Sequence, residues 1–289
     1  MEYRQRNRLR DQLRRRGPLA FTATALWLSW AALSFALYHL EHGLLIALLL
    51  LGLLVLMSGA YSLLWLRRDM RRERQRERKQ IQDLAWLSAN IQPRLPLPPY
   101  VGGMARPELL CTIRQLIHEE RPQRVLELGS GLSTLVMAYA LADNRQGEIF
   151  ALEDQASYAT QTRHLLAEHL LTEHAHVLDA PLRQWEVNGR QRQWYCLSNL
   201  PVDDPFDFIL VDGPAGYLAP MIRYPALPLL HSHFAENAII LLDDVRRQQE
   251  KQIAQRWLAE IPGLQRDEGF TDTSFAVFRY TRTHNGSSA

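Results

Sequence analysis

The sequence predicts an α/β chain, in which a doubly wound, mostly parallel sheet follows a two-helix transmembrane hairpin. Three observations lead to this expectation. Two long uncharged apolar runs occur near the N-terminus, strands and helices alternate from residue 105 onward, and the charges are divided unevenly between these two parts. Strand–helix alternation is typical of a parallel sheet that has helices on both faces.

The transmembrane hairpin is expected over residues 18–66. Pro18–Leu40 and Gly43–Leu66 contain 23 and 24 residues without a charge, and only Glu41 and His42 separate them. At 1.5 Å per residue each run spans about 35 Å, which exceeds a hydrocarbon core of roughly 30 Å. A buried hairpin in a soluble protein and a cleaved signal peptide are the alternatives, and neither explains two adjacent runs of this length.

Basic residues flank the hairpin on both sides. The basic N-terminal segment, residues 1–17, holds seven arginines, and residues 67–79 hold eight Arg or Lys, while the short loop holds neither. Because positively charged flanks stay inside, both termini and the following domain are expected in the cytoplasm, on a multi-pass protein of the inner (plasma) membrane. The expected partner of this region is the lipid bilayer.

The overall charge of +2 conceals an acidic C-terminal part, since residues 80–289 carry 25 acidic and 18 basic side chains. A nucleic-acid partner is therefore not expected, because such proteins place basic patches on the folded domain. The two cysteines are too few for a disulfide framework or a structural zinc site.

Residues 67–104 are expected to form a juxtamembrane helix, over 67–90, and a proline-rich linker. The α/β domain is expected over 105–281, followed by a polar tail at 282–289. Apolar residues at helical spacing predict helices, listed here in order: 107–120, 132–142, 155–171, 220–231 and 246–260. Short apolar runs predict the strands 124–128, 148–152, 174–178, 206–211, 238–242, 264–270 and 274–280. Asn188–Gly189 predicts a hairpin turn within 182–200, and the last two strands, with no helix between them, predict an antiparallel edge.

Polar and small residues follow four of the expected strands, where ligands bind in folds of this class. The first strand contains Glu127 and ends in Gly129-Ser130-Gly131, whose glycines allow a tight turn and close approach of a ligand. The second ends in Glu153, which is placed to accept hydrogen bonds from two ribose hydroxyls. Asp179-Ala180 follow the third strand, and Asp212 follows the strand that ends at Val211.

These segments resemble the class I S-adenosylmethionine (SAM)-dependent methyltransferases, over about residues 105–281. The resemblance implies a Rossmann-like methyltransferase fold with SAM as the cofactor. It implies that Glu127, Gly129, Ser130 and Gly131 hold the methionine part, that Glu153 binds the ribose, and that Asp179 and Ala180 border the adenine. Ser133 stands where the family usually has glycine. A dinucleotide-binding enzyme is the alternative. Its Gly-x-Gly-x-x-Gly/Ala motif requires glycine or alanine at the last position, where this sequence has Thr134.

A weaker similarity links the chain to the catechol-type O-methyltransferases. It implies a divalent ion, Mg²⁺ or Mn²⁺, held by Asp212, Asp243 and Asp244, with Asp212 as the catalytic residue. Two residues depart from that pattern, because Asp244 replaces an asparagine and Ala215 replaces a lysine. The alternative is that Asp243 and Asp244 cap the helix that follows them.

The expected function is thus that of a membrane-anchored, cytoplasm-facing SAM-dependent methyltransferase, with metal-assisted O-methyl transfer as one form. The alternative is a non-enzymatic membrane scaffold with the same fold. The methyl acceptor is not identified by the sequence, although the anchor favours a lipid-linked or membrane-associated one.

Overall fold

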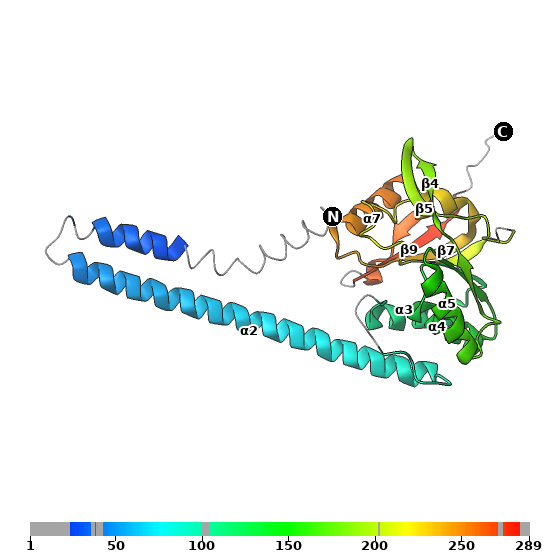
Figure 1. Ribbon diagram of the computed structural model, residues 1–289, viewed down its shortest axis with the longest axis horizontal. Coiled ribbons are helices and arrows are strands. Elements are labelled where there is room, and N and C mark those ends of the chain that lie inside the picture. Colours follow the sequence, from blue (N-terminus) through cyan, green and yellow to red (C-terminus); the bar gives the residue numbers. More distant parts are fainter. Residues whose placement is uncertain are drawn as a thin grey trace. The chain divides into compact units, whose positions relative to one another are not determined.

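The computed structural model describes residues 24–35, 38, 43–99, 104–201, 203–270 and 274–283. The basic segment 1–17, the start of the first apolar run, the turn at Glu41 and His42 and most of the polar tail lie outside the described residues. The chain divides into two compact units, Met1–Lys79 and Gln80–Ala289 (Figure 1). The expected hairpin turn and its orientation therefore stay predictions.

Helix α2 runs without a break from Gly43 to Ile91. The second apolar run and the helix expected over 67–90 are thus one helix of 49 residues, in which no proline interrupts the backbone hydrogen bonds. By length and composition alone, α2 is able to cross a membrane. The apolar helix Thr24–Phe35 is shorter than a membrane-spanning helix over its described residues. Apolar side chains of α2 are widely exposed, and Leu56 is 72% accessible.

The second unit is built on a seven-stranded sheet in the order β3-β2-β1-β6-β7-β9-β8. The strands are β1 (Arg124–Leu128), β2 (Glu148–Glu153), β3 (Ala175–Asp179), β6 (Phe206–Val211), β7 (Phe234–Leu242), β8 (Leu264–Arg266) and β9 (Ala276–Thr281). The first five of these pair in parallel, and β9 lies antiparallel between β7 and β8. The predicted α/β fold with a mostly parallel sheet is confirmed, and the expected antiparallel pair is β8–β9.

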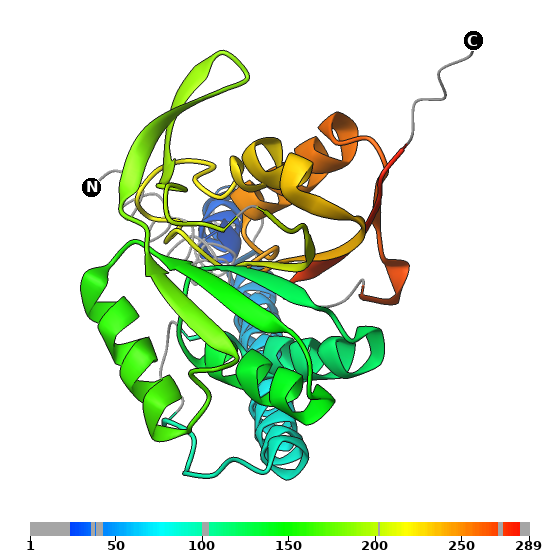
Figure 2. The same ribbon diagram turned by 90° about the vertical axis from the view of Figure 1, so that its right-hand side faces the viewer.

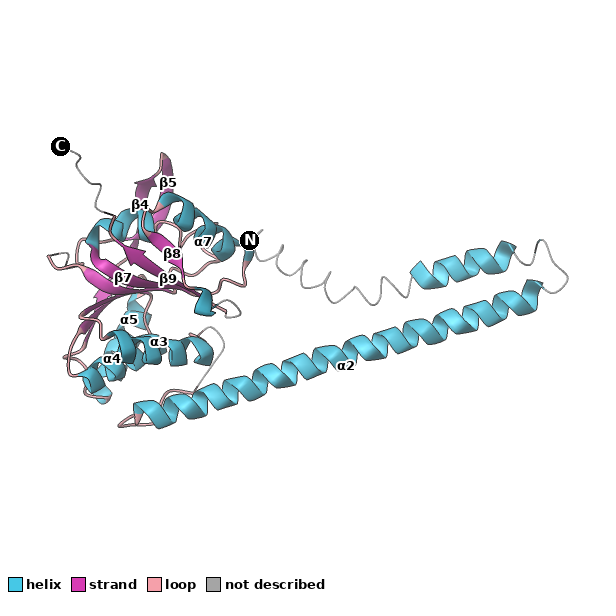
Figure 3. Ribbon diagram, turned by 180° about the vertical axis from the view of Figure 1, so that it is seen from behind, coloured by secondary structure: helices cyan, strands magenta, loops and turns pink. Residues whose placement is uncertain are grey.

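Helices cover both faces of the sheet (Figures 2 and 3). They are α3 (Pro107–Glu120), α4 (Leu132–Asn144), α5 (Ala156–Glu168), α6 (Ala226–Leu230) and α7 (Gln248–Glu260). Val125 of β1 packs in the core beneath α3, α4 and α5, whereas Leu126 and Leu128 pack with α6 and α7 on the other face. Because strand side chains alternate, Glu127 points to the same face as Val125.

The C-terminal end of α2 belongs to the core of the second unit. Leu87 and Ile91 are 0% and 3% exposed and pack with α3 and α4. Arg114 donates to the carbonyl of Asn90 over 3.3 Å, and the thiol of Cys111 donates to the carbonyl of Asp83 over 3.2 Å. The compact unit thus includes residues from Gln80 onward, which the sequence analysis assigned to the juxtamembrane segment.

The predicted hairpin turn at Asn188–Gly189 joins β4 (Leu182–Val187) and β5 (Arg190–Tyr195), which form a two-stranded sheet of their own among the described strands (Figure 1). Tyr224 fastens this hairpin to α7. Its hydroxyl accepts a hydrogen bond from Asn188 over 2.6 Å and donates one to Glu260, and its carbonyl accepts one from Trp257 over 2.9 Å.

The helix predicted over 220–231 is mostly irregular. Only Ala226–Leu230 is α-helical, with a 3-10 turn at His231–His233. Proline disfavours the helical conformation of the residue before it, so Pro225 prevents the helix from extending back through Tyr224. Likewise β8 ends at Arg266, and a 3-10 turn at Glu268–Phe270 replaces the rest of the predicted strand.

Candidate active site

The loops that follow β1 and β6 lie side by side. From β1 the strand order runs outward to β3, and the chain then returns to β6 on the other side of β1. Ligands bind at such a reversal in open α/β sheets. The amides of Asp212 and Gly213 both donate to the carbonyl of Leu128, over 3.0 and 2.5 Å. A Cβ atom on Gly129 would lie 3.5 Å from the amide nitrogen of Gly213.

The glycine loop after β1 borders open space. Gly129 and Gly131 have φ angles of +112° and +147°, which residues with a side chain rarely adopt. Among the described residues, nothing lies within 4 Å of a Cβ atom placed on Gly131. Helix α4 begins at the next residue, Leu132, so its first amides face the end of this loop. An anionic group of a ligand is stabilised at such a helix terminus.

Glu127 is hydrogen-bonded to the residues that follow the glycine loop. Its carboxylate is fully buried and accepts hydrogen bonds from Ser133 over 2.5 Å and from Thr134 over 2.6 Å. Thr134 also accepts a hydrogen bond from the amide of Gly131 over 2.9 Å. Burial raises the pKa of Glu127 to about 8, against the opposing effect of the two hydroxyls. The structure thus connects this predicted cofactor residue to the loop through the first turn of α4.

Glu153 lies at the end of β2, beside the glycine loop. One carboxylate oxygen accepts a hydrogen bond from Ser130 over 2.9 Å, and the other accepts one from the amide of Gln155 over 3.1 Å. Ser130 also contacts the hydroxyl of Thr162 at 3.1 Å. Burial raises the pKa of Glu153. The predicted residues Ser130 and Glu153 are therefore in direct contact.

The two residues predicted after β3 point in different directions. The carboxylate of Asp179 forms an ion pair with Arg163 of α5 at 2.9 Å and is half-exposed. Ala180 is buried, and its amide donates to the carbonyl of Glu153 over 2.8 Å. The backbone of this segment thus adjoins Glu153, while the side chain of Asp179 is engaged with α5.

The acidic trio, Asp212, Asp243 and Asp244, gathers at the ends of β6 and β7. One carboxylate oxygen from each residue lies within 4.8 Å of the other two, the one such group of possible ligands among the described residues. Asp243 is 4% exposed, and its Oδ1 atom has no hydrogen-bond partner in the described part of the chain. Asp244 has a φ angle of +64°. The structure thus brings these three carboxylates together, as the sequence predicts.

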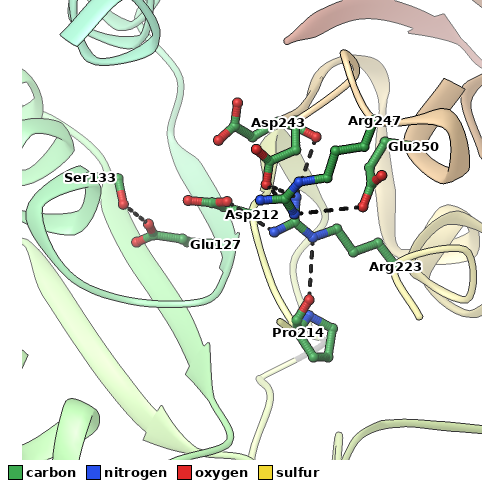
Figure 4. Close-up of polar contacts among 9 residues, drawn as sticks. Glu127, Ser133, Asp212, Pro214, Arg223, Asp243, Arg247 and Glu250 are labelled. Atoms are coloured by element: carbon green, nitrogen blue, oxygen red, sulfur yellow. Dashed lines mark hydrogen bonds and ion pairs between the residues drawn. The ribbon is translucent and has the colours of Figure 1, made fainter. Parts of the chain in front are cut away.

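Arg223 lies among the carboxylates of the trio (Figure 4). Its guanidinium contacts Asp212 Oδ1 at 3.2 Å and Asp244 Oδ2 at 3.3 Å. It also donates to the carbonyls of Asp243 and Pro214, each over 3.3 Å. A second arginine, Arg247, pairs with the same Asp244 oxygen at 2.7 Å, but its side chain is 49% exposed.

Burial and mutual repulsion shift the ionisation of this cluster. Burial raises the pKa of Asp212 to about 8, opposed by Arg223 and reinforced by Asp243 and Asp244. Burial likewise raises the pKa of Asp243 and of the neighbouring Glu250. Burial alone would lower the pKa of Arg223, but the surrounding carboxylates hold it above its usual value. The carboxylates around Arg223 therefore favour its charged form.

Two residues of this region were not predicted as site residues. Tyr195, at the end of β5, is 1% exposed, and its hydroxyl occupies the place that a Cβ atom on Gly213 would take. Burial and the carboxylates of Asp154 and Glu153 raise the pKa of Tyr195 well above its usual value. Arg223 comes from the irregular stretch before α6. Neither residue belongs to a sequence motif, so only the fold could reveal them.

Residues 126–245 match a protein family described as a methyltransferase domain. Solved structures with a similar fold include the O-methyltransferase from Bacillus cereus in complex with SAH, 16% identical, covering 70% of this chain and 90% of that one with a TM-score of 0.47. A Podospora anserina methyltransferase bound to SAH is 17% identical, over 71% and 88% of the two chains, with a TM-score of 0.47. The tomaymycin-synthesis O-methyltransferase from Streptomyces achromogenes, in complex with SAM, is 17% identical over 68% and 89%, with a TM-score of 0.45. No curated protein sequence matches the chain.

Proposed function

We propose that this chain, whose residues 126–245 match a methyltransferase domain, is a SAM-dependent O-methyltransferase anchored in a membrane. The observation that carries the cofactor assignment is the contact between the glycine loop and Glu153. Ser130 of the loop donates to Glu153 over 2.9 Å, and no atom of the described residues lies within 4 Å of a Cβ atom placed on Gly131. These residues fit a ligand with an anionic end and a ribose.

Each part of this cradle matches one part of SAM. The N-terminal amides of α4 suit the carboxylate of the methionine moiety. Glu153 is a buried acceptor at the position where a carboxylate binds ribose hydroxyls. When bound, SAM supplies a methyl group that is already activated, so the protein's contribution is mainly to align the acceptor with it.

Asp212 is the residue that we assign as the proton acceptor. It follows β6 at the loop that touches Gly129, so it lies on the acceptor side of the cradle. Its Oδ1 atom is held by Arg223, and its side chain is 24% exposed, unlike that of the buried Asp243. A pKa of about 8 places Asp212 near the range where a general base works best. Asp212 would take the proton of an acceptor hydroxyl as its oxygen is methylated.

Metal-assisted transfer is the alternative that the sequence suggests. The oxygen ligands of the acidic trio suit Mg²⁺ or Mn²⁺, and Asp243 Oδ1 has no partner among the described residues. However, Asp212 and Asp244 already bind Arg223, so an ion would share two of its three carboxylates with a buried guanidinium. The residues present therefore fit a resident ion poorly, and the proposed transfer needs none.

Membrane anchoring is supported by α2 and by the two uncharged runs. The exposed leucines of α2 form an apolar surface that a bilayer would cover, since water around them is unfavourable. The flanking arginines favour a cytoplasmic domain with both termini inside, on the inner (plasma) membrane. In this location the acceptor would be lipid-linked or membrane-associated.

Calorimetric titration of the detergent-purified full-length protein with SAM tests the cofactor assignment. We expect binding by the wild type and at least tenfold weaker binding by Glu153→Ala, or about 1.4 kcal/mol, because two hydrogen bonds to a charged acceptor are lost. Glu186→Ala, which removes an exposed carboxylate from β4, is the matched control and should bind normally. Binding of a nicotinamide dinucleotide in place of SAM would contradict the assignment.

The acceptor is sought with membranes and SAM that carries a labelled methyl group. Label in the organic-solvent extract would support a lipid-linked acceptor, and label in the washed membrane-protein fraction would support a protein neighbour. Label recovered only in small water-soluble compounds would contradict a membrane-associated acceptor.

A further inference from the structure

We propose that the guanidinium of Arg223 takes the position of a metal ion in this site and holds the acidic trio together. The inference deepens the proposed function, on which it rests only for the placing of the acceptor at Asp212. It concerns what neutralises the three carboxylates. Its test measures metal binding, so it can fail while SAM binding stands.

Three close carboxylates need a cation, because their mutual repulsion in a buried site would otherwise be large. Arg223 meets this need from inside the cluster. Its side chain is 4% exposed, and its two terminal nitrogens contact Asp212 and Asp244. A planar guanidinium donates in fixed directions and keeps its charge even when buried, which suits it to join two carboxylates.

Backbone carbonyls fix the arginine in place. Nε donates to the carbonyl of Pro214 in the loop after β6, and Nη1 donates to the carbonyl of Asp243 at the end of β7, each over 3.3 Å. The guanidinium therefore links the loops after both strands, which is the structural task that a shared ion would perform. A side chain held by four such contacts cannot swing away to admit an ion without breaking them.

Arg247 differs from Arg223 in the respect that matters for this inference. Arg247 approaches Asp244 at 2.7 Å from α7, and half of its side chain is exposed. Among the described residues it forms no ion pair or hydrogen bond with Asp212, although its charge helps to lower the pKa of that carboxyl. Removing Arg247 would leave the bridge between the loops intact, so this residue provides a matched control.

The acceptor side of the site follows from this arrangement. Arg223 holds Asp212 through Oδ1, so the second oxygen of Asp212 is the one left for an acceptor proton. Arg223 is thus a positioning residue, because it acts through Asp212. Methyl transfer would depend on a built-in cation and not on the supply of divalent ions.

Titration of the chelator-treated full-length protein with Mn²⁺, followed by electron paramagnetic resonance, tests the proposal. We expect the wild type and Arg247→Ala to bind Mn²⁺ at this site at least tenfold more weakly than Arg223→Ala, in which the trio loses its internal cation. Asp212→Asn in the Arg223→Ala background should abolish the gained binding. SAM titration of the same samples shows whether the cofactor site is intact.

Two results would overturn the proposal. One is tight Mn²⁺ binding by the wild type that Asp212→Asn removes, which would show an ion beside the arginine. The other is a folded Arg223→Ala variant, judged by circular dichroism, that gains no Mn²⁺ binding. If Arg223→Ala does not fold, the wild-type titration decides alone, and Arg223→Lys, which keeps a positive charge, should bind Mn²⁺ as weakly as the wild type.

Discussion

Gly213 faces a tyrosine hydroxyl at the centre of the candidate site, and this contact yields a sharp prediction about packing. A Cβ atom on Gly213 would overlap the hydroxyl of Tyr195 and would lie 3.1 Å from the carbonyl oxygen of Leu128 and 3.2 Å from the Cα atom of Gly129. Tyr195 is 1% exposed and packs edge-on against Trp194, with 5.5 Å between the ring centres, so it has little room to move.

Gly213→Ala should therefore destabilise the protein by about 1–3 kcal/mol, the usual cost of adding a methyl group to a filled core. For a unit of this size that corresponds to a fall in Tm of about 2–4 °C for each kcal/mol. Tyr195→Phe removes the overlapping oxygen, so the double variant should recover much of the loss. Recovery should be incomplete, because the two tight backbone contacts remain.

Thermal unfolding of the detergent-purified full-length protein measures these effects, and the four proteins of a double-mutant cycle give the coupling between the two positions. Tyr224→Phe is the matched control, since Tyr224 is an equally buried tyrosine that contacts Glu260 and not Gly213. Titration with SAM adds a functional readout, because Gly213 contacts Gly129 of the glycine loop. Wild-type stability of Gly213→Ala, or equal rescue by Tyr224→Phe, would refute the assigned packing.

Three further predictions concern the charged residues and the boundary of the domain. Glu127→Gln should remove a pH dependence of the free energy of unfolding. Because the pKa of Glu127 is raised, the folded wild type keeps a proton that its unfolded chain releases. The stability of the wild type therefore falls between pH 4.5 and about 8, by up to about 1.4 kcal/mol per pH unit. Urea unfolding at several pH values should then show the variant gaining on the wild type across this window, and parallel curves would contradict the burial effect. Asp212→Asn should lower turnover about 10²–10⁴-fold with SAM affinity nearly unchanged, and wild-type kcat/KM should rise with pH towards a plateau above about 8 as Asp212 loses its proton; a pH-independent rate would exclude it as the base. A fragment of residues 80–289 should be more stable to urea than one of residues 92–289. The shorter fragment lacks the buried side chains of Leu87 and Ile91, each of which contributes about 1.5–3 kcal/mol to the free energy of unfolding. Equal stability of the two fragments would show that the end of α2 is dispensable.

The central strands could be predicted from the sequence because their apolar runs are short, continuous and bounded by turn residues. The predicted bounds of β1 and β6 agree with the structure residue for residue. Once these strands are parallel neighbours, the residues that follow them must meet at one edge. The contact between Ser130 and Glu153 and the convergence of the acidic trio are consequences of that rule.

The loops that complete the site could not be predicted in the same way. Arg223 lies in a stretch with helical spacing of apolar residues. Pro225 signals a break in that helix, but no sequence pattern places the arginine among the carboxylates. Similarly, Tyr195 is brought to Gly213 by a hairpin that pairs with no strand of the main sheet. Both contacts are long-range, so they depend on tertiary packing and leave no periodic signal in the sequence.

The adjacent residues Arg223 and Tyr224 also couple the local unfolding of the segments that they join. One side chain is locked among the carboxylates after β6 and β7, and the other is locked to α7 and to the hairpin turn. A local fluctuation that frees either side chain displaces the peptide group between them and so loosens the other. The hairpin, the stretch before α6 and helix α7 should accordingly exchange their amide hydrogens as one cooperative block, with protection factors that change together when Asn188 is substituted.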